Sequence, residues 1–367
     1  MKLKSLLLAS AAATMAVTTA NAADAVVEED EAVEYVRVCE TFGTGYFFIP
    51  GTETCIRISG DVRIDYAYDD FDVPVLEPAP AGLALDDGDG RWRTRGRVEV
   101  STATETDLGN VTSFTRLQGT SASGVAGTVL VDQAIIGIGG FSGGFGDNYW
   151  SRNIGFGLVG GITDGLYGYN NANFVEYTFE ASGFAITAGA EVARPENVFG
   201  FRDPEEDVAL YAGVNYGGSW GNVGATLYYD LAEDNTIGQL NGVGNGGFAY
   251  NIGAQIKPIE GLNLEAFFLG GEGFYVFNAG GFGADYAWGV GAGYTFSDVT
   301  PYILYTDTDG ANDGYVSVGA FWQPSGTGLT FQAEATFYND NSATVNGVTV
   351  NSGNLDRRYS LRLRRAF

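Results

Sequence analysis

The chain has 367 residues, a formal net charge of −26, 14% aromatic residues and no histidine. So acidic a chain is a poor candidate for nucleic-acid binding, which begins with the neutralisation of phosphates. A composition this aromatic and apolar is not that of a disordered protein, and without histidine a Ser-His-Asp hydrolase site is excluded. We therefore expect a folded protein that is not an enzyme.

The first 22 residues have the pattern of a signal peptide. Lysines at positions 2 and 4 precede a short apolar stretch at 6–17 and the small residues Ala20-Asn21-Ala22. This order of basic, apolar and small residues predicts cleavage before Ala23 and export of the mature chain. The apolar stretch is too short to be a transmembrane helix.

Cys39 and Cys55 are the two cysteines of the chain. In an exported protein such a pair is expected to form a disulfide. Zinc sites need about four nitrogen or sulfur ligands, so we expect neither a metal site nor a cofactor. The disulfide would tie a periplasmic N-terminal segment, residues 23–54, to the start of the first predicted strand.

Apolar and polar residues alternate along most of the mature chain, most clearly from Ile56 to Asp69. The same two-residue period recurs at 175–180, 223–231, 250–257 and 329–338. A single segment of this kind also fits a soluble sheet, but many such segments of about ten residues are the signature of transmembrane β-strands. Because lipid offers no water to backbone groups, such strands must close into a barrel.

The pattern predicts an all-β fold in which residues 55–367 form a transmembrane barrel of sixteen antiparallel strands. Short turns alternate with long polar connections, which is typical of periplasmic and extracellular sides, and both termini are expected in the periplasm. A turn at 139–140 makes the count even, and sixteen strands leave room for a water-filled lumen. The expected strands are 55–68, 91–104, 111–119, 129–138, 141–148, 173–180, 184–193, 207–216, 222–231, 247–257, 262–270, 284–296, 300–307, 314–323, 329–338 and 355–367.

Ten arginines lie on the polar faces of the first three strands and the last. If the last strand pairs with the first, these residues form one basic wall of the pore: Arg57, Arg63, Arg91, Arg93, Arg95, Arg97, Arg116, Arg358, Arg362 and Arg364. The same phase on other strands is acidic, at Glu176, Glu191, Asp230, Glu265 and Glu334. A basic wall facing acidic walls would orient hydrated, dipolar solutes. The alternative is that these charges only neutralise their neighbours, as Glu99 would neutralise Arg97.

Three stretches of the sequence resemble the alphaproteobacterial porin family: the start (20–25, 35–39 and 45–57), residues 134–141 and the end (361–367). The resemblance implies a homotrimer of sixteen-stranded barrels, each narrowed by an inward-folded third extracellular loop. It also implies that Phe367 helps the barrel assembly machinery to recognise the chain. The third loop is expected at 150–172, with Asp147, Asp164 and Glu176 as candidate acidic residues of the constriction.

The sequence therefore predicts an outer-membrane porin, a channel for passive diffusion of small hydrophilic solutes and ions. The alternatives are a substrate-selective channel, for sugars or anions, and a non-conducting structural or adhesin barrel. The expected partners are outer-membrane lipid and glycolipid, further copies of the chain, the assembly machinery and the permeating solutes.

Overall fold

The computed structural model describes residues 37–71, 89–154, 160–163, 168–192, 208–231, 247–272, 284–310, 314–339, 342–345, 348–351 and 355–367. The chain divides into two units, Met1–Arg37 and Val38–Phe367. The second unit is described below. The predicted signal peptide, residues 1–22, and residues 23–36 of the predicted periplasmic segment lie outside the described residues.

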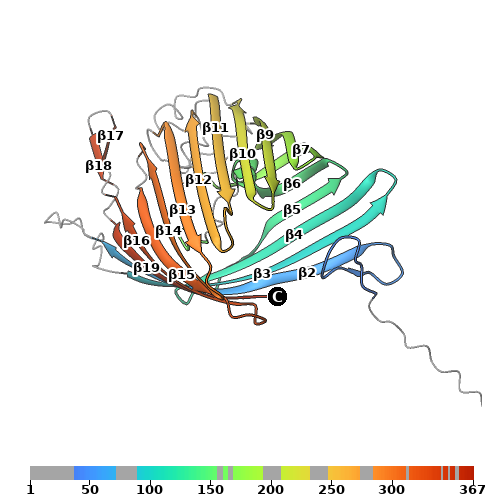
Figure 1. Cartoon of the computed structure of the whole chain (residues 1–367), viewed down its shortest axis with the longest axis horizontal. Coiled ribbons are helices and arrows are strands. Elements are labelled where there is room, and N and C mark those ends of the chain that lie inside the picture. Colours follow the sequence, from blue (N-terminus) through green and yellow to red (C-terminus); the bar gives the residue numbers. More distant parts are fainter. Residues whose placement is uncertain are drawn as a thin grey trace, which may run out of the picture. The chain divides into compact units, whose positions relative to one another are not determined.

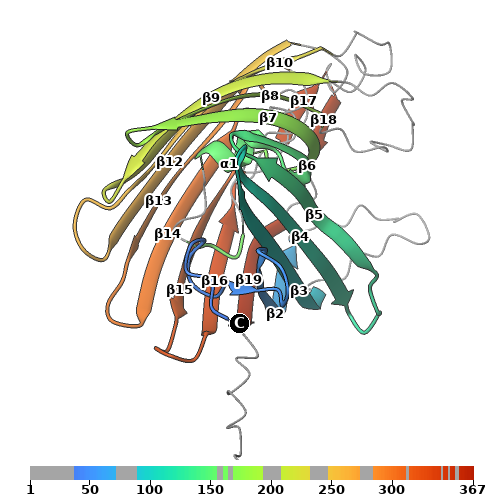
Figure 2. The same cartoon turned by 90° about the vertical axis from the view of Figure 1, so that its right-hand side faces the viewer.

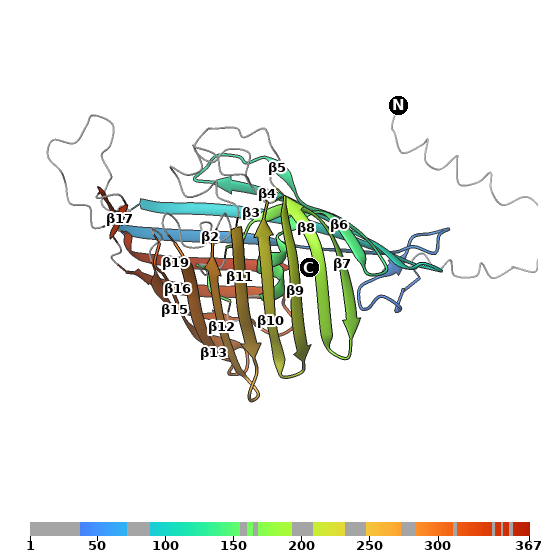
Figure 3. The same ribbon diagram turned by 90° about the horizontal axis from the view of Figure 1, so that it is seen from above.

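Sixteen long antiparallel strands, counted over the described residues, form one closed barrel (Figures 1 and 3). Each strand pairs with the next along the chain, and the last closes the ring on the first. The strands are β2 (Cys55–Phe71), β3 (Asp89–Thr106), β4 (Gly109–Ala122), β5 (Val129–Ile138), β6 (Phe141–Asp147), β7 (Asn171–Ala181), β8 (Phe184–Val192), β9 (Ala209–Gly218), β10 (Gly221–Asp230), β11 (Gly247–Ile256), β12 (Leu262–Gly271), β13 (Tyr286–Tyr294), β14 (Val299–Thr308), β15 (Tyr315–Trp322), β16 (Leu329–Tyr338) and β19 (Leu355–Ala366). The predicted sixteen-stranded antiparallel barrel is confirmed, and each predicted strand overlaps an observed one.

Four short elements were not predicted. They are β1 (Phe47–Phe48), the helix α1 (Tyr149–Ile154) between β6 and β7, and the hairpin of β17 (Ser342–Val345) and β18 (Val348–Asn351) between β16 and β19. No helix in the described part of the chain is long and apolar enough to cross a membrane.

The two faces of the barrel wall differ in the way that the alternation predicts. On β9, Leu210, Val214 and Tyr216 are exposed on the outer face, whereas Tyr211 is buried on the inner face. Acidic residues such as Glu191 are also buried on the inner side. Exposed apolar and buried ionised side chains invert the order of a water-soluble protein, which is what a wall in contact with lipid requires.

Aromatic side chains gather on the outer face near both ends of the strands. Near the short turns the ring pairs are Tyr216–Trp220, Tyr294–Phe296 and Trp322–Phe331. Near the long connections they are Tyr229–Phe248, Phe268–Tyr286 and Trp288–Tyr305. Amphipathic rings favour the membrane–water interface, so the two belts mark the borders of the apolar zone.

The short turns are built for tight reversal. Ser182 and Gly183 join β7 to β8 with φ values of 52° and 84°, and two positive φ angles are what a two-residue hairpin of matching twist needs. Residues 139–140 connect β5 to β6, so the turn that made the predicted count even is present.

The N-terminal segment is attached to the first barrel strand. Cys39 and Cys55 form the predicted disulfide, and both are buried. β19 pairs with β2 only as far as Asp61, so β2 extends past the point of closure. β1 pairs with the first residues of this extension, and it thereby covers a strand edge that would otherwise be open.

Candidate pore constriction

The closure of the barrel makes β19, β2, β3 and β4 neighbours. The arginines predicted for one wall therefore lie on adjacent strands, and in the paired register Arg93 and Arg362 both stand opposite Asp65. Arg57 is the exception in position, because it lies at the start of β2 with its guanidinium 4.9 Å from the ring centre of Tyr46.

Three aspartates of β2 run along the middle of this wall, and each lies between one arginine of β19 and one of β3. Asp69 pairs with Arg358 at 2.6 Å and with Arg91, Asp65 with Arg362 at 2.7 Å and Arg93 at 2.8 Å, and Asp61 with Arg364 at 3.4 Å and Arg95 at 3.6 Å. All three aspartates are buried. Crowded guanidinium groups repel one another unless partners separate them, and these carboxylates are such partners.

A second charged group continues the wall on β4 and β5. Arg116 pairs with Asp132 and lies 3.5 Å from Asp147, while Arg97 lies 3.6 Å from Asp132. Asp147 also accepts hydrogen bonds from Gln133 at 2.5 Å and from the Tyr169 hydroxyl at 3.1 Å. The predicted acidic residue Asp147 thus lies beside the basic wall.

Asp132 was not predicted, and its position depends on a bulge. Gln133 stands opposite Arg116 and Val131 opposite Leu117, so Asp132 is the extra residue at the register shift between β4 and β5. A bulge re-aims a side chain, and Asp132 consequently reaches Arg116. Strict alternation does not reveal such a position.

The connection between β6 and β7 begins with α1, which Figure 2 shows inside the ring of strands. The backbone N–H of Tyr149 donates to Glu191 at 3.1 Å, and that of Trp150 donates to the Tyr228 hydroxyl at 2.8 Å. The Asn251 side chain donates to the Trp150 carbonyl at 3.0 Å. The Trp150 side chain is fully buried, so α1 is held against the inner faces of β8, β10 and β11.

Glu176 of β7 lies beneath this helix. Arg152 donates to both of its carboxylate oxygens, at 2.9 and 2.8 Å, and the Tyr211 hydroxyl donates at 2.8 Å. Glu176 is 8% exposed, so the structure places this predicted constriction residue at the base of α1. Asp164, the third predicted acidic residue, lies outside the described residues.

Further along, the same connection contacts the other side of the barrel. Glu334 of β16 accepts the backbone N–H groups of Ile162 at 2.6 Å and Thr163 at 2.8 Å, as well as the Tyr302 hydroxyl at 2.7 Å. Gln332 donates to the carbonyl of Gly160. The described residues of the connection are therefore fixed both to β7–β11 and to β16.

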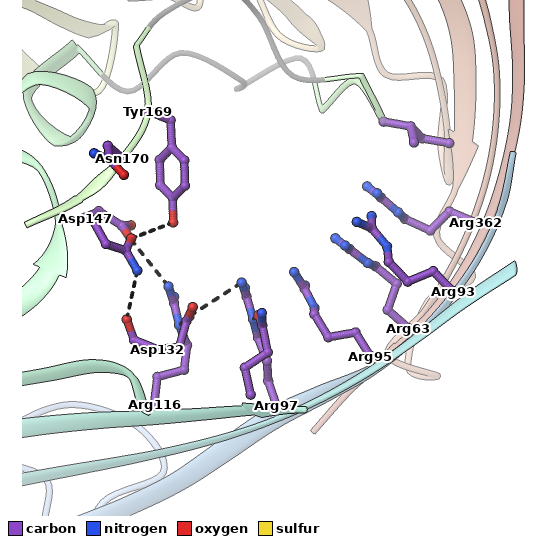
Figure 4. A pocket seen from close by; sticks show the side chains of 13 residues that line it. Arg63, Arg93, Arg95, Arg97, Arg116, Asp132, Asp147, Tyr169, Asn170 and Arg362 are labelled. Carbon is purple, nitrogen blue, oxygen red and sulfur yellow. Dashed lines mark hydrogen bonds and ion pairs between the residues drawn. The ribbon is translucent and has the colours of Figure 1, made fainter. Parts of the chain in front are cut away.

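A polar cavity of about 640 Å³ lies between this connection and the basic wall (Figure 4). Six of the ten predicted arginines line it, while Arg57, Arg91, Arg358 and Arg364 do not. The lining residues are Arg63, Arg93, Arg95, Arg97, Arg116, Arg362, Gln118, Asp132, Asp147, Ile162, Tyr169, Asn170 and Asn171.

Comparison with protein families matches residues 24–350 to the Porin subfamily. Porin Omp2b of Brucella suis is 35% identical over 263 residues, which are 66% of this chain and 70% of that protein. Porin Omp2b of Brucella abortus is 35% identical over 266 residues, with the same coverage.

Among solved structures, the outer membrane channel DcaP of Acinetobacter baumannii is similar with a TM-score of 0.61 and 16% identity, over 87% of this chain and 99% of that one. A triple mutant of Rhodopseudomonas blastica porin has a TM-score of 0.52 and 15% identity, over 85% and 100%. At such low identity these two structures support the fold alone, whereas the sequence matches assign the family. The chain belongs to the Porin subfamily, and its barrel is an outer-membrane porin channel.

Proposed function

We propose that the connection between β6 and β7 is the constriction loop of a passive, water-filled pore for small hydrophilic solutes. The observation that carries this proposal is the attachment of the connection to two parts of the wall, through Glu176 and Glu191 on one side and Glu334 on the other. A segment held at both ends keeps a fixed gap beside the basic wall. The charged and amide lining of that gap favours hydrated solutes over apolar ones.

A sugar-selective channel is the second candidate, and it would use a row of aromatic rings along the lumen. The inner-face tyrosines Tyr211, Tyr228 and Tyr302 are buried and bonded to the connection or to its acidic anchors. They are thus not available as a continuous surface for a passing sugar, which favours the general pore.

Liposome swelling with uncharged sugars of graded size tests the proposal. A rate that falls smoothly with solute size and rises linearly with concentration supports a general pore. Saturation with one sugar would support a selective channel, and absence of swelling would support a non-conducting barrel.

We also propose that the channel assembles as a homotrimer through the outer faces of β3 and β4. Beside the exposed apolar residues Trp92, Val98 and Leu117, these faces carry several small residues: Thr94, Gly96, Thr102, Thr104, Ser113 and Thr115. Thr102 and Ser113 hydrogen-bond each other, and Thr104 bonds to Thr54. The proposal therefore rests on the small size of these residues, which would let another copy pack closely against the wall.

Gly96 offers a clean test of this interface, because a Cβ added there has nothing within 4 Å. Gly96→Trp should leave the barrel folded and convert trimers to monomers in native electrophoresis. The control is Ala212→Trp on the exposed outer face of β9, which should remain trimeric. Trimers of both variants would exclude this face.

Export and assembly complete the proposal. We infer cleavage of residues 1–22, a periplasmic location for 23–54, and recognition of Phe367 by the assembly machinery. The backbone of Phe367 exchanges hydrogen bonds with Gly60 at 3.0 and 3.1 Å, and its ring is exposed, so the ring is accessible where β19 closes the barrel on β2.

The outer lipid and glycolipid would contact the apolar belt and the long connections. N-terminal sequencing of the mature protein tests the cleavage site, and Phe367→Ala should slow insertion into vesicles by the purified assembly machinery.

A further inference from the structure

The charged residues that line the cavity form two groups, which differ in net charge. In the first group, Arg97 and Arg116 face Asp132 and Asp147, so that two positive charges meet two negative ones. These four side chains also bond to one another, as the dashed lines in Figure 4 show. This half of the cavity is close to neutral.

The second group, which we call the arginine subsite, consists of Arg63, Arg93, Arg95 and Arg362. In Figure 4 the nitrogen ends of these four side chains point into the cavity. The carboxylates paired with them are Asp61 and Asp65. Four guanidinium groups paired with two carboxylates leave a surplus of two positive charges. Asp61 also pairs with Arg364, so its negative charge is shared with an arginine outside the subsite.

The guanidinium groups of this subsite are incompletely hydrogen bonded. Asp61 meets Arg95 at 3.6 Å, which is longer than a charge-assisted hydrogen bond. Within the described residues, the Nε atoms of Arg63 and Arg95 are buried and have no hydrogen-bond acceptor of good geometry, although that of Arg63 lies 3.0 Å from Asp65. Each guanidinium group has five N–H donors, so the two carboxylates leave part of the donor capacity of the four arginines unused.

The acidic residues of the other walls do not offset this surplus. Glu176, Glu191 and Glu334 are 8%, 1% and 5% exposed, and all three accept hydrogen bonds from the connection. Arg152 neutralises Glu176, whereas Glu191 and Glu334 keep their negative charge but are buried beneath the connection. None of the acidic residues predicted for these walls, Asp230 and Glu265 included, lines the cavity. The field that a solute meets there is set by the arginines.

We propose that the arginine subsite binds small dianionic oxyanions, of the sulfate or phosphate-monoester type, and that the channel prefers anions. The proposal rests on the water-filled pore proposed above and names the solute class that its constriction favours. The planar guanidinium fork matches the oxygens of such anions in pairs. A surplus of two charges suits a dianion better than chloride, and a cavity of about 640 Å³ admits it with part of its water.

The test uses the purified full-length protein in planar bilayers, with inorganic sulfate as the probe. In a gradient of KCl at low ionic strength the reversal potential should show preference for chloride. Addition of sulfate should reduce the chloride current with a saturating dependence on concentration. The double variant Arg63→Gln with Arg93→Gln should move the reversal potential toward potassium and weaken the sulfate block at least tenfold.

Two further variants separate a binding subsite from a general positive field. Arg91→Gln changes the same residue type on the same strand, but Arg91 pairs with Asp69 away from the cavity, so both readouts should stay as in the unmodified protein. Arg63→Lys with Arg93→Lys keeps the charge and removes the fork, so the chloride preference should persist while the sulfate block weakens.

Three results would overturn the proposal: preference of the unmodified channel for potassium, a sulfate effect that never saturates, or equal behaviour of the Gln double variant and Arg91→Gln. A complete lack of conductance by the unmodified protein would instead refute the proposed pore itself, so the two failures are distinguishable.

Discussion

Replacing Glu334 with glutamine should loosen the connection between β6 and β7 from β16. The carboxylate accepts two backbone N–H groups, at 2.6 and 2.8 Å, and the Tyr302 hydroxyl at 2.7 Å. Glutamine keeps the shape but has one acceptor oxygen, and its NH₂ group faces a donor. Hydrogen bonds to charged groups contribute about 1.5–3 kcal/mol each. Loss of one such bond therefore raises the detached fraction of the connection by about tenfold to a hundredfold.

Single-channel recording measures this effect, because a detached connection changes the width of the pore. Glu334→Gln should show greater open-channel noise and visits to a second conductance level. Tyr302→Phe removes one of the donors to Glu334, leaves both backbone N–H contacts of the connection in place, and should give a smaller effect. Glu180→Gln, at an exposed position near the short-turn end of β7, is the control. If Glu334→Gln and Glu180→Gln give the same noise and levels, the carboxylate does not hold the connection.

Three further changes test the contacts that hold the barrel and its N-terminal segment. Arg152→Met leaves the Glu176 carboxylate buried without its paired donor, at a cost of about 3–5 kcal/mol; the temperature at which the folded gel band disappears should fall, and an unchanged temperature would contradict the anchoring role. Cys39→Ser opens the N-terminal disulfide and removes about 3 kcal/mol of chain-entropy stabilisation, so limited proteolysis should remove the segment faster while conductance stays the same. In Gly60→Ala the new Cβ would lie 2.8 Å from the Phe367 ring as well as against the backbone of β3; closure should slow in vesicle insertion assays, and insertion at the usual rate would refute this steric argument.

The fold could be predicted from the sequence because a lipid-facing wall imposes its period on every strand. Because apolar residues face outward and polar residues face inward, the sequence of each strand alternates, whatever the length of the turns between the strands. The elements that escaped prediction do not carry this period. α1 has six residues and is held by the tertiary contacts of Trp150, and the β17–β18 hairpin belongs to a connection outside the barrel wall.

The site could be predicted in part, for a related reason. The arginines share a polar face on strands that closure makes adjacent, so their wall follows from the alternation alone. The pairing of Asp65 with arginines on both sides requires the register, and Asp132 requires the bulge. The anchoring by Glu334 joins residues 172 positions apart, for which no local pattern exists.

The net charge of −26 gives no guide to the sign of selectivity in this channel. It counts acidic residues of the long connections together with Glu191 and Glu334, which are buried under hydrogen bonds from the connection. Exposed charges are screened over about 8 Å at physiological ionic strength. The electrostatic energy of a solute at the narrow part of the pore therefore depends on the few charges that it contacts. Because the carboxylates nearest the arginine subsite are fewer than its guanidinium groups, an acidic protein can present a basic constriction.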